Sequence, residues 1–316
     1  MRIVCIGCAP TTLGFAYRLN EIIKEGIEDV DDVELIVLEK EMKPGGLSGT
    51  IRDEHGFLWD MGGHITFSHN FPYYEKGINL VPYPAQFAVP LFPEETKRKC
   101  LTELKQRYED FPKYGGTGAV WEKMEQMLPS KWFKYGAKVI KIDYNKKRLV
   151  YTNTEGREHR LNYDILINSG PIDILVEQTK ICTPLQLKHN KVIIVGVGLE
   201  LPFTEFCQAT EEEIRDQAVE GLIRKTIIKR EKIVSIFSIT LPYGYPIPTI
   251  QRDSELSRCH SILEEYQIYS RGRFGGWKYE VSNQDHCFIQ GKELCDRLVL
   301  GENEKLYKTL VPEKRG

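Results

Sequence analysis

The chain has 316 residues, enough for about two average domains, and 41% of them are hydrophobic. Its 43 basic and 45 acidic side chains give a net charge of −2, which argues against the basic surface of nucleic-acid or membrane-binding proteins. The longest apolar stretch, 191–200, is too short to span a bilayer. Eight cysteines are too few for a disulfide scaffold. We expect a reduced, cytoplasmic protein whose first strand begins at Met1, which leaves no room for a leader.

The first forty residues predict a strand–helix–strand unit. The apolar run 2–7 ends in glycine and indicates a buried strand. A helix is expected over 10–26, with Pro10 at its first position. A second apolar strand over 33–39 ends in an acid. This order is typical of the start of a doubly wound α/β fold.

The middle of the chain alternates short elements. A hairpin is expected from strands 50–52 and 57–60, followed by an irregular segment, 71–93, rich in proline and aromatic residues. A helix is then expected over 94–108. A glycine loop at 114–118 opens a second helix, which runs to about residue 128. Three strands should form a β-meander, namely 138–143, 148–153 and 157–161.

The last part predicts more buried strands and helices. Strands are expected over 163–168 and 233–240, and helices over 210–225, 253–265 and 283–300. Thr210 and Glu213 form a capping box. The run 195–198 looks like a second nucleotide turn, but it lacks a third glycine and Pro202 follows, so it is interpreted as a buried strand end.

The turn after the first strand has the layout of a dinucleotide-binding loop. In such a loop, glycines allow the bend and the close approach of a pyrophosphate, which then lies on a helix N-terminus. Only Gly7 keeps its place here, while Ala9 and Thr12 replace the other two glycines. Glu39 stands where a carboxylate would accept ribose hydroxyls. A strand–helix–strand unit without a cofactor remains the alternative.

Three further runs could carry chemistry. Residues 39–50 place Pro44-Gly45-Gly46 soon after the acid, which adds backbone donors for phosphate; the alternative is a surface turn. Residues 57–64 end in Gly62-Gly63-His64, where glycines can lie against a flat ring beside a titratable histidine, although a lone histidine is usually structural. Residues 270–286 combine arginines, glycines and aromatics before a helix N-terminus; the alternative is a solvated loop. Cys5-x-x-Cys8 is interpreted as core packing.

These four runs occur in one order with Ile-Thr-Phe-Ser-His (65–69), Val-Pro-Tyr-Pro (81–84), Phe-Pro-x-x-Gly-Gly-Thr-Gly (111–118) and Tyr-Gly-Tyr-Pro-Ile-Pro-Thr (243–249). Together they resemble the FAD-dependent UDP-galactopyranose mutases of the eukaryotic type, within the amine-oxidase-like flavoproteins. The resemblance implies a doubly wound, Rossmann-like FAD-binding α/β fold with a β-meander. It implies a discontinuous FAD domain of residues 1–70, 129–200 and 241–316, with a reduced substrate region from 71–128 and 201–240.

The resemblance also implies an activity. In that family, N5 of the reduced flavin attacks the anomeric carbon of UDP-galactopyranose, and UDP-galactofuranose is formed without net redox change. The enzyme would be an isomerase, an intramolecular transferase. NADPH is the possible reductant, and the partner would be a nucleotide sugar of the UDP-galactose type.

Site residues follow from the resemblance by position. Arg273 would clamp the diphosphate, and the helix start at Asn283 would favour an anionic flavin. The implied cofactor contacts are Gly7, Ala9, Pro10, Thr11, Glu39, Lys40, Gly45, Gly46, Leu47, Gly62, Gly63, His64, Val139, Asn283 and Gln284. Catalytic roles are implied for His64 and Arg273, and substrate contacts for Tyr245, Arg273, Tyr279 and Asn283. No metal site is expected.

The chain also departs from the family pattern. Members are longer, and stretches that they carry are absent here between 76 and 81, between 108 and 111, and between 201 and 204. Two other functions therefore stay open, namely a catalytically silent relative and an FAD-dependent oxidase or reductase of a small substrate. A non-enzymatic binding module is the remaining possibility.

Overall fold

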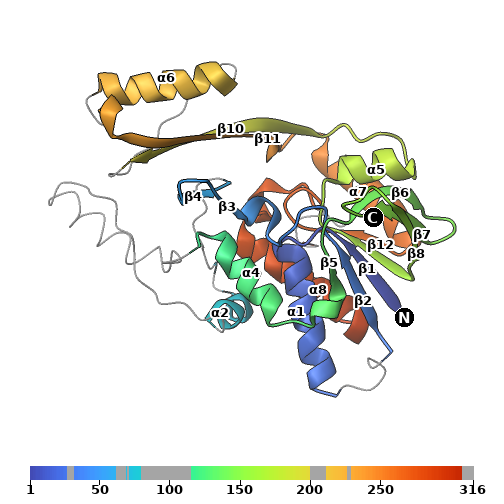
Figure 1. Ribbon diagram of the computed structural model, residues 1–316. Coiled ribbons are helices and arrows are strands. Elements are labelled where there is room, and N and C mark those ends of the chain that lie inside the picture. Colours follow the sequence, from blue (N-terminus) through green and yellow to red (C-terminus); the bar gives the residue numbers. More distant parts are fainter. Residues whose placement is uncertain are drawn as a thin grey trace.

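The computed structural model describes residues 1–26, 32–61, 69, 71–79, 115–199, 211–225 and 229–307. Its centre is a five-stranded sheet in the order β12-β9-β1-β2-β5, with all neighbours parallel (Figure 1). The strands are β1 (Arg2–Ile6), β2 (Glu34–Leu38), β5 (Phe133–Lys134), β9 (Ile165–Asn168) and β12 (Ile268–Ser270). The apolar runs predicted for β1, β2 and β9 are the buried centre of this sheet because both of its faces are covered.

Helices cover one face of the sheet. They are α1 (Pro10–Lys24), α2 (Pro72–Asn79), α4 (Gly118–Gln126) and α8 (Gln284–Leu300). Phe288 and Trp121 are fully buried between them. Helices α1 and α8 approach closely through glycines, since a Cβ on Gly14 would lie 2.1 Å from the carbonyl oxygen of Phe288.

The other face carries a mixed layer. The expected β-meander is present as β6 (Lys138–Asp143), β7 (Arg148–Thr152) and β8 (Glu158–Asn162), beside α5 (Ile172–Thr179) and α7 (Arg252–Glu265). Leu149, Leu256 and Trp277 form part of its core and are fully buried. Layers on both sides of a parallel sheet confirm the predicted doubly wound α/β class.

A long antiparallel ribbon extends from this body (Figure 1). It pairs β10 (Lys188–Leu199) with β11 (Ile233–Ile247), and α6 (Glu211–Arg224) packs on it through Val219 and Leu222. Below it lies the expected hairpin of β3 (Thr50–Arg52) and β4 (Leu58–Asp60). The rings of Trp59 and Phe237 stack with centroids 5.4 Å apart. Four short helical turns complete the description: Gly46–Ser48, Ser130–Trp132, Arg230–Lys232 and Tyr279–Val281.

Several expectations require correction. Part of the segment predicted to be irregular is helix α2, because Pro72 suits a first helical position and Tyr74 is buried against Phe288. The run 195–198 lies at the end of a strand, as expected, but this strand is β10 of the ribbon, whose residues 188–195 are exposed or half-buried. Helix α5 was not expected. The predicted helix 94–108 and the capping residue Thr210 lie outside the described residues.

None of the helices within the described ranges is long and apolar enough to cross a membrane. Helices α2 and α4, which belong to the predicted second region, pack in the same core as α1 and α8. The predicted division into domains stays a prediction.

Candidate functional site

The N-terminus of α1 presents unpaired backbone donors at the edge where β1 ends. Gly7 turns the chain with φ of +89°. Ala9 is the N-cap, no side chain caps the helix, and its first turn has no acidic residue. Such an end favours an anion through its free N–H groups and its macrodipole.

Thr12 occupies the position of the third glycine without opening the turn. Its side chain is buried, and its hydroxyl donates a hydrogen bond of 2.7 Å to the carbonyl oxygen of Gly7. The close helix contact is made one half-turn later by Gly14. The departure from the glycine pattern is therefore accommodated within the turn.

Glu39 lies beside this helix end and is 5% exposed. One carboxylate oxygen accepts the backbone N–H of Cys8 at 2.6 Å, and the other accepts that of Glu41 at 2.9 Å. Burial raises the pKa of Glu39, although these two hydrogen bonds oppose the shift. The side chain is thus held in place as an acceptor, which is the chemistry needed to bind two neighbouring hydroxyls.

The second glycine run packs directly on the first. The N–H of Gly45 donates to the carbonyl oxygen of Cys8 at 2.8 Å. A Cβ on Gly46 would lie 3.4 Å from the Cβ of Ala9. Gly45 and Gly46 both have positive φ. Two loops that are far apart in sequence therefore form one backbone surface, with Leu47 half-buried beside it.

The run 270–286 also reaches the N-terminus of α1. Gly272 has φ of +95°, and a Cβ there would lie 2.4 Å from the hydroxyl oxygen of Thr11. Its N–H donates to the side-chain oxygen of Gln290 at 2.8 Å. A Cβ on Gly291 would lie 1.9 Å from the carbonyl oxygen of Thr11. Helix α8 therefore crosses the first turn of α1.

The N-terminus of α8 is a second uncapped helix end. Asn283 is its N-cap and makes no side-chain capping bond. The next residue, Gln284, accepts a hydrogen bond of 2.8 Å from the indole N–H of Trp121. The crossing point at Gly291 lies two turns further along, so the two helix starts are about 10 Å apart along α8. The two ends differ in charge, because the first turn of α8 carries the buried carboxylate of Asp285, whereas that of α1 has no acidic residue.

Three of the predicted substrate contacts are neighbours. The guanidinium of Arg273 stacks 4.6 Å over the ring of Tyr245, and the rings of Tyr245 and Tyr279 are 5.9 Å apart. Arg273 also donates to the carbonyl oxygen of Gly244 at 3.1 Å and to the hydroxyl of Ser282 at 3.1 Å. The two tyrosines remain half-exposed, and this cluster adjoins the N-cap of α8.

A cluster of two histidines and a carboxylate was not singled out by sequence reasoning. Nδ1 of His69 lies 2.6 Å from Oδ2 of Asp285, which also accepts the His69 backbone N–H at 2.9 Å. The ring of His286 lies 4.3 Å from that of His69. Burial lowers the pKa of His286. The sequence signal that could have indicated this cluster is the Asp285-His286 pair in the first turn of the last predicted helix.

This His69–Asp285–His286 group is the one set within the described ranges whose ligand atoms could converge on a metal ion, lying within 4.8 Å of one another. Because Asp285 already binds His69 twice, the arrangement is that of a hydrogen-bonded pair. The pair joins residue 69 to the first turn of α8.

Of the remaining predicted cofactor contacts, the structure describes some and leaves others outside its described residues. Val139 on β6 is buried, and its neighbour Ala137 donates its N–H to the carbonyl oxygen of Glu39 at 2.8 Å. Lys40 is exposed and pairs with Glu41. Gly62, Gly63 and His64 lie outside the described residues. Cys5 and Cys8 are buried and not bonded to each other, as expected from core packing.

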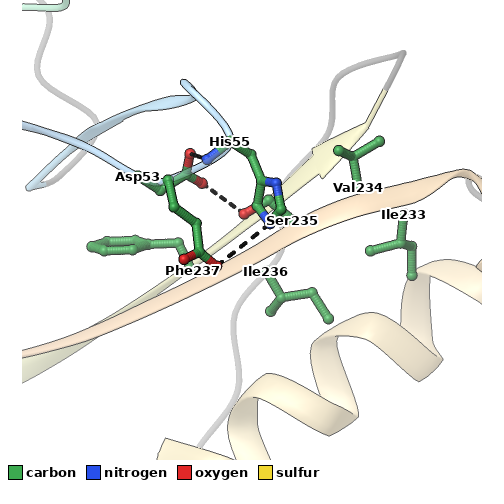
Figure 2. A pocket seen from close by; sticks show the side chains of 8 residues that line it. Asp53, His55, Ile233, Val234, Ser235, Ile236 and Phe237 are labelled. Carbon is green, nitrogen blue, oxygen red and sulfur yellow. Dashed lines mark hydrogen bonds and ion pairs between the residues drawn. The ribbon is translucent and has the colours of Figure 1, made fainter.

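A separate cavity of about 440 Å³ lies under the ribbon, lined by residues 53–55 and 233–237 (Figure 2). Asp53 spans it, accepting hydrogen bonds from the hydroxyl of Ser235 at 2.6 Å and from the indole N–H of Trp59 at 2.9 Å. Desolvation alone would raise the pKa of Asp53, but these hydrogen bonds hold it below its usual value. Sequence reasoning did not find this cavity.

Comparisons place the fold among known structures. No protein-family model matches the chain. The fold is similar to that of a reduced UDP-galactopyranose mutase, with a TM-score of 0.76 and 22% identity, over 97% of this chain and 95% of that chain. It is also similar to a CLA-producing fatty acid isomerase from P. acnes (TM-score 0.62, 13% identity, 94% and 98% covered). A candidate protoporphyrinogen oxidase from Exiguobacterium sp. 255-15 matches with a TM-score of 0.56 and 13% identity, over 95% of this chain and 99% of that chain.

These similarities define the class of fold, which is that of the α/β enzymes just named. They agree with the sequence-based fold class. At 22% identity or less they carry the fold and not the reaction.

Proposed function

We propose that this chain is a flavoprotein that binds FAD. The observation that carries the proposal is the uncapped start of α1 beside the buried acceptor Glu39, with the uncapped start of α8 about 10 Å along α8 from the point where the two helices cross. The first end fits a pyrophosphate with its ribose on Glu39. The second fits a ring system that can carry negative charge.

The residues present fit the cofactor. The backbone of Gly7, Ala9, Pro10 and Thr11 would lie against the pyrophosphate. The donors would be the N–H groups of Ala9 and Thr11, because no side chain caps the helix, whereas Pro10 has no N–H and Gly7 donates its own to the carbonyl oxygen of Leu38. The adenosine half would lie against Val139 and Glu39, with Lys40 nearby. The flavin half would lie along Gly45, Gly46 and Leu47, with Gly62, Gly63 and His64, and towards Asn283 and Gln284.

A binding experiment tests this step. Purified protein is incubated with FAD, desalted, and its absorbance spectrum recorded before and after dithionite. We expect a protein-bound flavin spectrum that dithionite bleaches. An Ala9→Asp variant should bind at least tenfold more weakly, since it puts a carboxylate against the pyrophosphate, while Ala218→Asp on α6 should bind normally. Folded protein that stays colourless overturns the proposal.

We further propose an activity of the UDP-galactopyranose mutase type. Reduced FAD, when bound, would supply a nucleophilic nitrogen for the anomeric carbon of the sugar. The chain's own part would be binding and orientation: Tyr245 and Tyr279 would contact the nucleotide sugar, Arg273 would face its diphosphate, and Asn283 would border both ligands. His64 would act beside the flavin, with NADPH as reductant. The Arg273–Tyr245–Tyr279 cluster, at the positions where the sequence resemblance implies substrate contacts, supports this proposal.

The activity is tested by chromatography of nucleotide sugars. Reduced holoprotein is incubated with UDP-galactopyranose and the mixture is separated. We expect UDP-galactofuranose, with loss of at least tenfold in kcat/KM for Arg273→Lys, because Lys cannot reproduce the guanidinium geometry. Bound flavin without interconversion would identify a silent relative. Rapid reoxidation by oxygen coupled to consumption of an amine would instead identify an oxidase.

A further inference from the structure

Two cysteine sulfurs face each other where the segment after α5 lies on α7. Sγ of Cys182 and Sγ of Cys259 are 3.9 Å apart. Cys259 is buried on α7, whereas Cys182 is partly exposed. The other cysteines within the described residues, Cys5, Cys8, Cys287 and Cys295, are all buried. Cys182 is therefore the described thiol that a reagent in solvent can reach.

The backbones that carry the two thiols are already held together. The N–H of Gln186 donates to Glu255 on α7 at 3.2 Å, and Arg258 on α7 donates to the carbonyl oxygen of Thr183 at 3.4 Å. A disulfide requires the two sulfurs to approach by about 2 Å more. We expect side-chain rotation to supply most of this movement, because the segment directly after Cys182 is anchored on α7.

The arginine that anchors the segment also lies next to Cys182. The guanidinium of Arg258 lies beside its sulfur, and Glu255 binds the same guanidinium at 2.9 Å. Desolvation raises the pKa of Cys259, so this thiol stays protonated. It reacts only after Cys182 has formed a disulfide with the reagent.

We propose that Cys182 and Cys259 form a reversible disulfide when the protein meets glutathione disulfide. The thiolate of Cys182 attacks one sulfur of the reagent, forming a mixed disulfide and releasing one glutathione thiolate. The sulfur of Cys259 then attacks Cys182, gives up its proton, and releases the second glutathione. Two protein thiols are oxidised, one glutathione disulfide is reduced, and both protons end on glutathione.

The disulfide between Cys182 and Cys259 would restrict the movement of the ribbon. It closes a loop of about 80 residues that contains β10, α6 and β11, and it fixes the approach to β10 onto α7. The base of the ribbon would then be covalently joined to the sheet domain. This inference is independent of the proposed cofactor and reaction.

Mass spectrometry of the folded, full-length chain tests the proposal. Protein is treated with glutathione disulfide, remaining thiols are alkylated, and the digest is mapped. We expect a cross-linked peptide pair containing Cys182 and Cys259, a loss of two hydrogen atoms from the intact mass, and reversal by dithiothreitol. The oxidised protein should also melt several degrees higher than the reduced protein, as expected for a closed loop.

Matched variants separate the pair from general thiol oxidation. Cys259→Ser should keep one bound glutathione on Cys182, since no second thiol can displace it. Cys182→Ser should gain neither modification, and Cys295→Ser should cross-link like the parent protein. Circular dichroism confirms that each variant is folded. A stable mixed disulfide on Cys182 of the parent chain, or no modification of Cys182, overturns the proposal.

Discussion

At the scale of single residues, the site depends on side chains that organise backbone. Thr12 closes the turn with its hydroxyl, and Glu39 collects two backbone N–H groups from different loops. Neither role needs the full glycine pattern of a nucleotide turn. The turn is therefore built from local hydrogen bonds that a glycine-based pattern does not capture.

Replacing Glu39 tests this role directly. Glu39→Ala leaves the buried N–H of Cys8 and the partly buried N–H of Glu41 without their acceptor, so we expect a loss of about 2 kcal/mol in the free energy of unfolding. The urea denaturation midpoint measures it, and FAD affinity should fall at least tenfold. Glu41→Ala removes an exposed carboxylate from the same loop and should change stability little. Equal effects of the two changes would argue against a structural role for Glu39.

At the scale of elements, the closest helix contact is made by two glycines. Gly14 on α1 meets the backbone at Phe288, and Gly291 on α8 meets the backbone at Thr11. Each helix thus presents a gap into which the other fits. This contact holds α1 and α8 in one position along each other, and it therefore sets where each helix start lies relative to the proposed ligand.

Gly14→Ala should separate these helices. The new Cβ would lie 2.1 Å from a backbone oxygen that cannot move alone, so we expect a loss of about 3 kcal/mol by overpacking. Gly221→Ala is the matched control, because α6 offers open space there, and a gain of up to about 1 kcal/mol is expected from helix propensity. Chemical denaturation of both variants decides the point, and a neutral Gly14→Ala would refute the close contact.

The hairpin is coupled to the ribbon through one carboxylate. Asp53→Ala removes the acceptor of both Ser235 and Trp59. We expect faster hydrogen exchange in 50–60 and 233–237, with the sheet domain unchanged. Glu54→Ala, at the same hairpin turn, should leave exchange in these segments as in the parent protein. Unchanged exchange in Asp53→Ala would show that the stacked rings of Trp59 and Phe237 hold the contact alone.

At the scale of the whole molecule, a buried ionic network joins distant segments. Arg271, which is 1% exposed, binds Glu304 through two nitrogens and also binds Glu264 on α7. Arg297 on α8 contacts the same two carboxylates. Arg271, in the run predicted to meet substrate, is therefore a structural residue. Next to this network, Tyr307 bonds the ring of His260 at 2.7 Å.

Acid should destabilise the fold through His260. Burial, reinforced by the nearby Arg271, lowers the pKa of His260 to about 3, whereas the unfolded side chain has a value of about 6.5. The unfolded state then binds more protons as the pH falls below about 6.5, so stability decreases. We expect His260 to account for about 2 kcal/mol of loss between pH 7 and pH 5.

Urea denaturation at the two pH values measures this loss. His260→Gln removes the titrating group and should flatten the dependence, while His159→Gln, exposed on β8, should keep it. Glu264, whose pKa is lowered to about 2 by its arginine partners against desolvation, contributes separately below about pH 4.5. A dependence that His260→Gln leaves unchanged would contradict the assignment.

The sequence predicted the sheet domain well because its signals are local. Apolar runs and Pro10 correctly indicated β1, α1 and β2, and the helix expected over 283–300 is present as α8. The ribbon was less predictable, since β11 continues through Pro242 and Pro246, residues that normally end a strand. The cavity at Asp53 and the pairing of His69 with Asp285 join residues far apart in the chain, so no local pattern reports them.

The two-stranded ribbon has a consequence for how copies of this protein meet. Each strand of a two-stranded sheet has one outer edge, and unpaired edges invite a strand from another molecule. Pro242 and Pro246 offer no backbone N–H along β11, and Lys188 and Lys191 place exposed positive charges on β10. The prolines that made β11 hard to predict from the sequence thus also leave this strand with fewer backbone donors for a strand of another molecule.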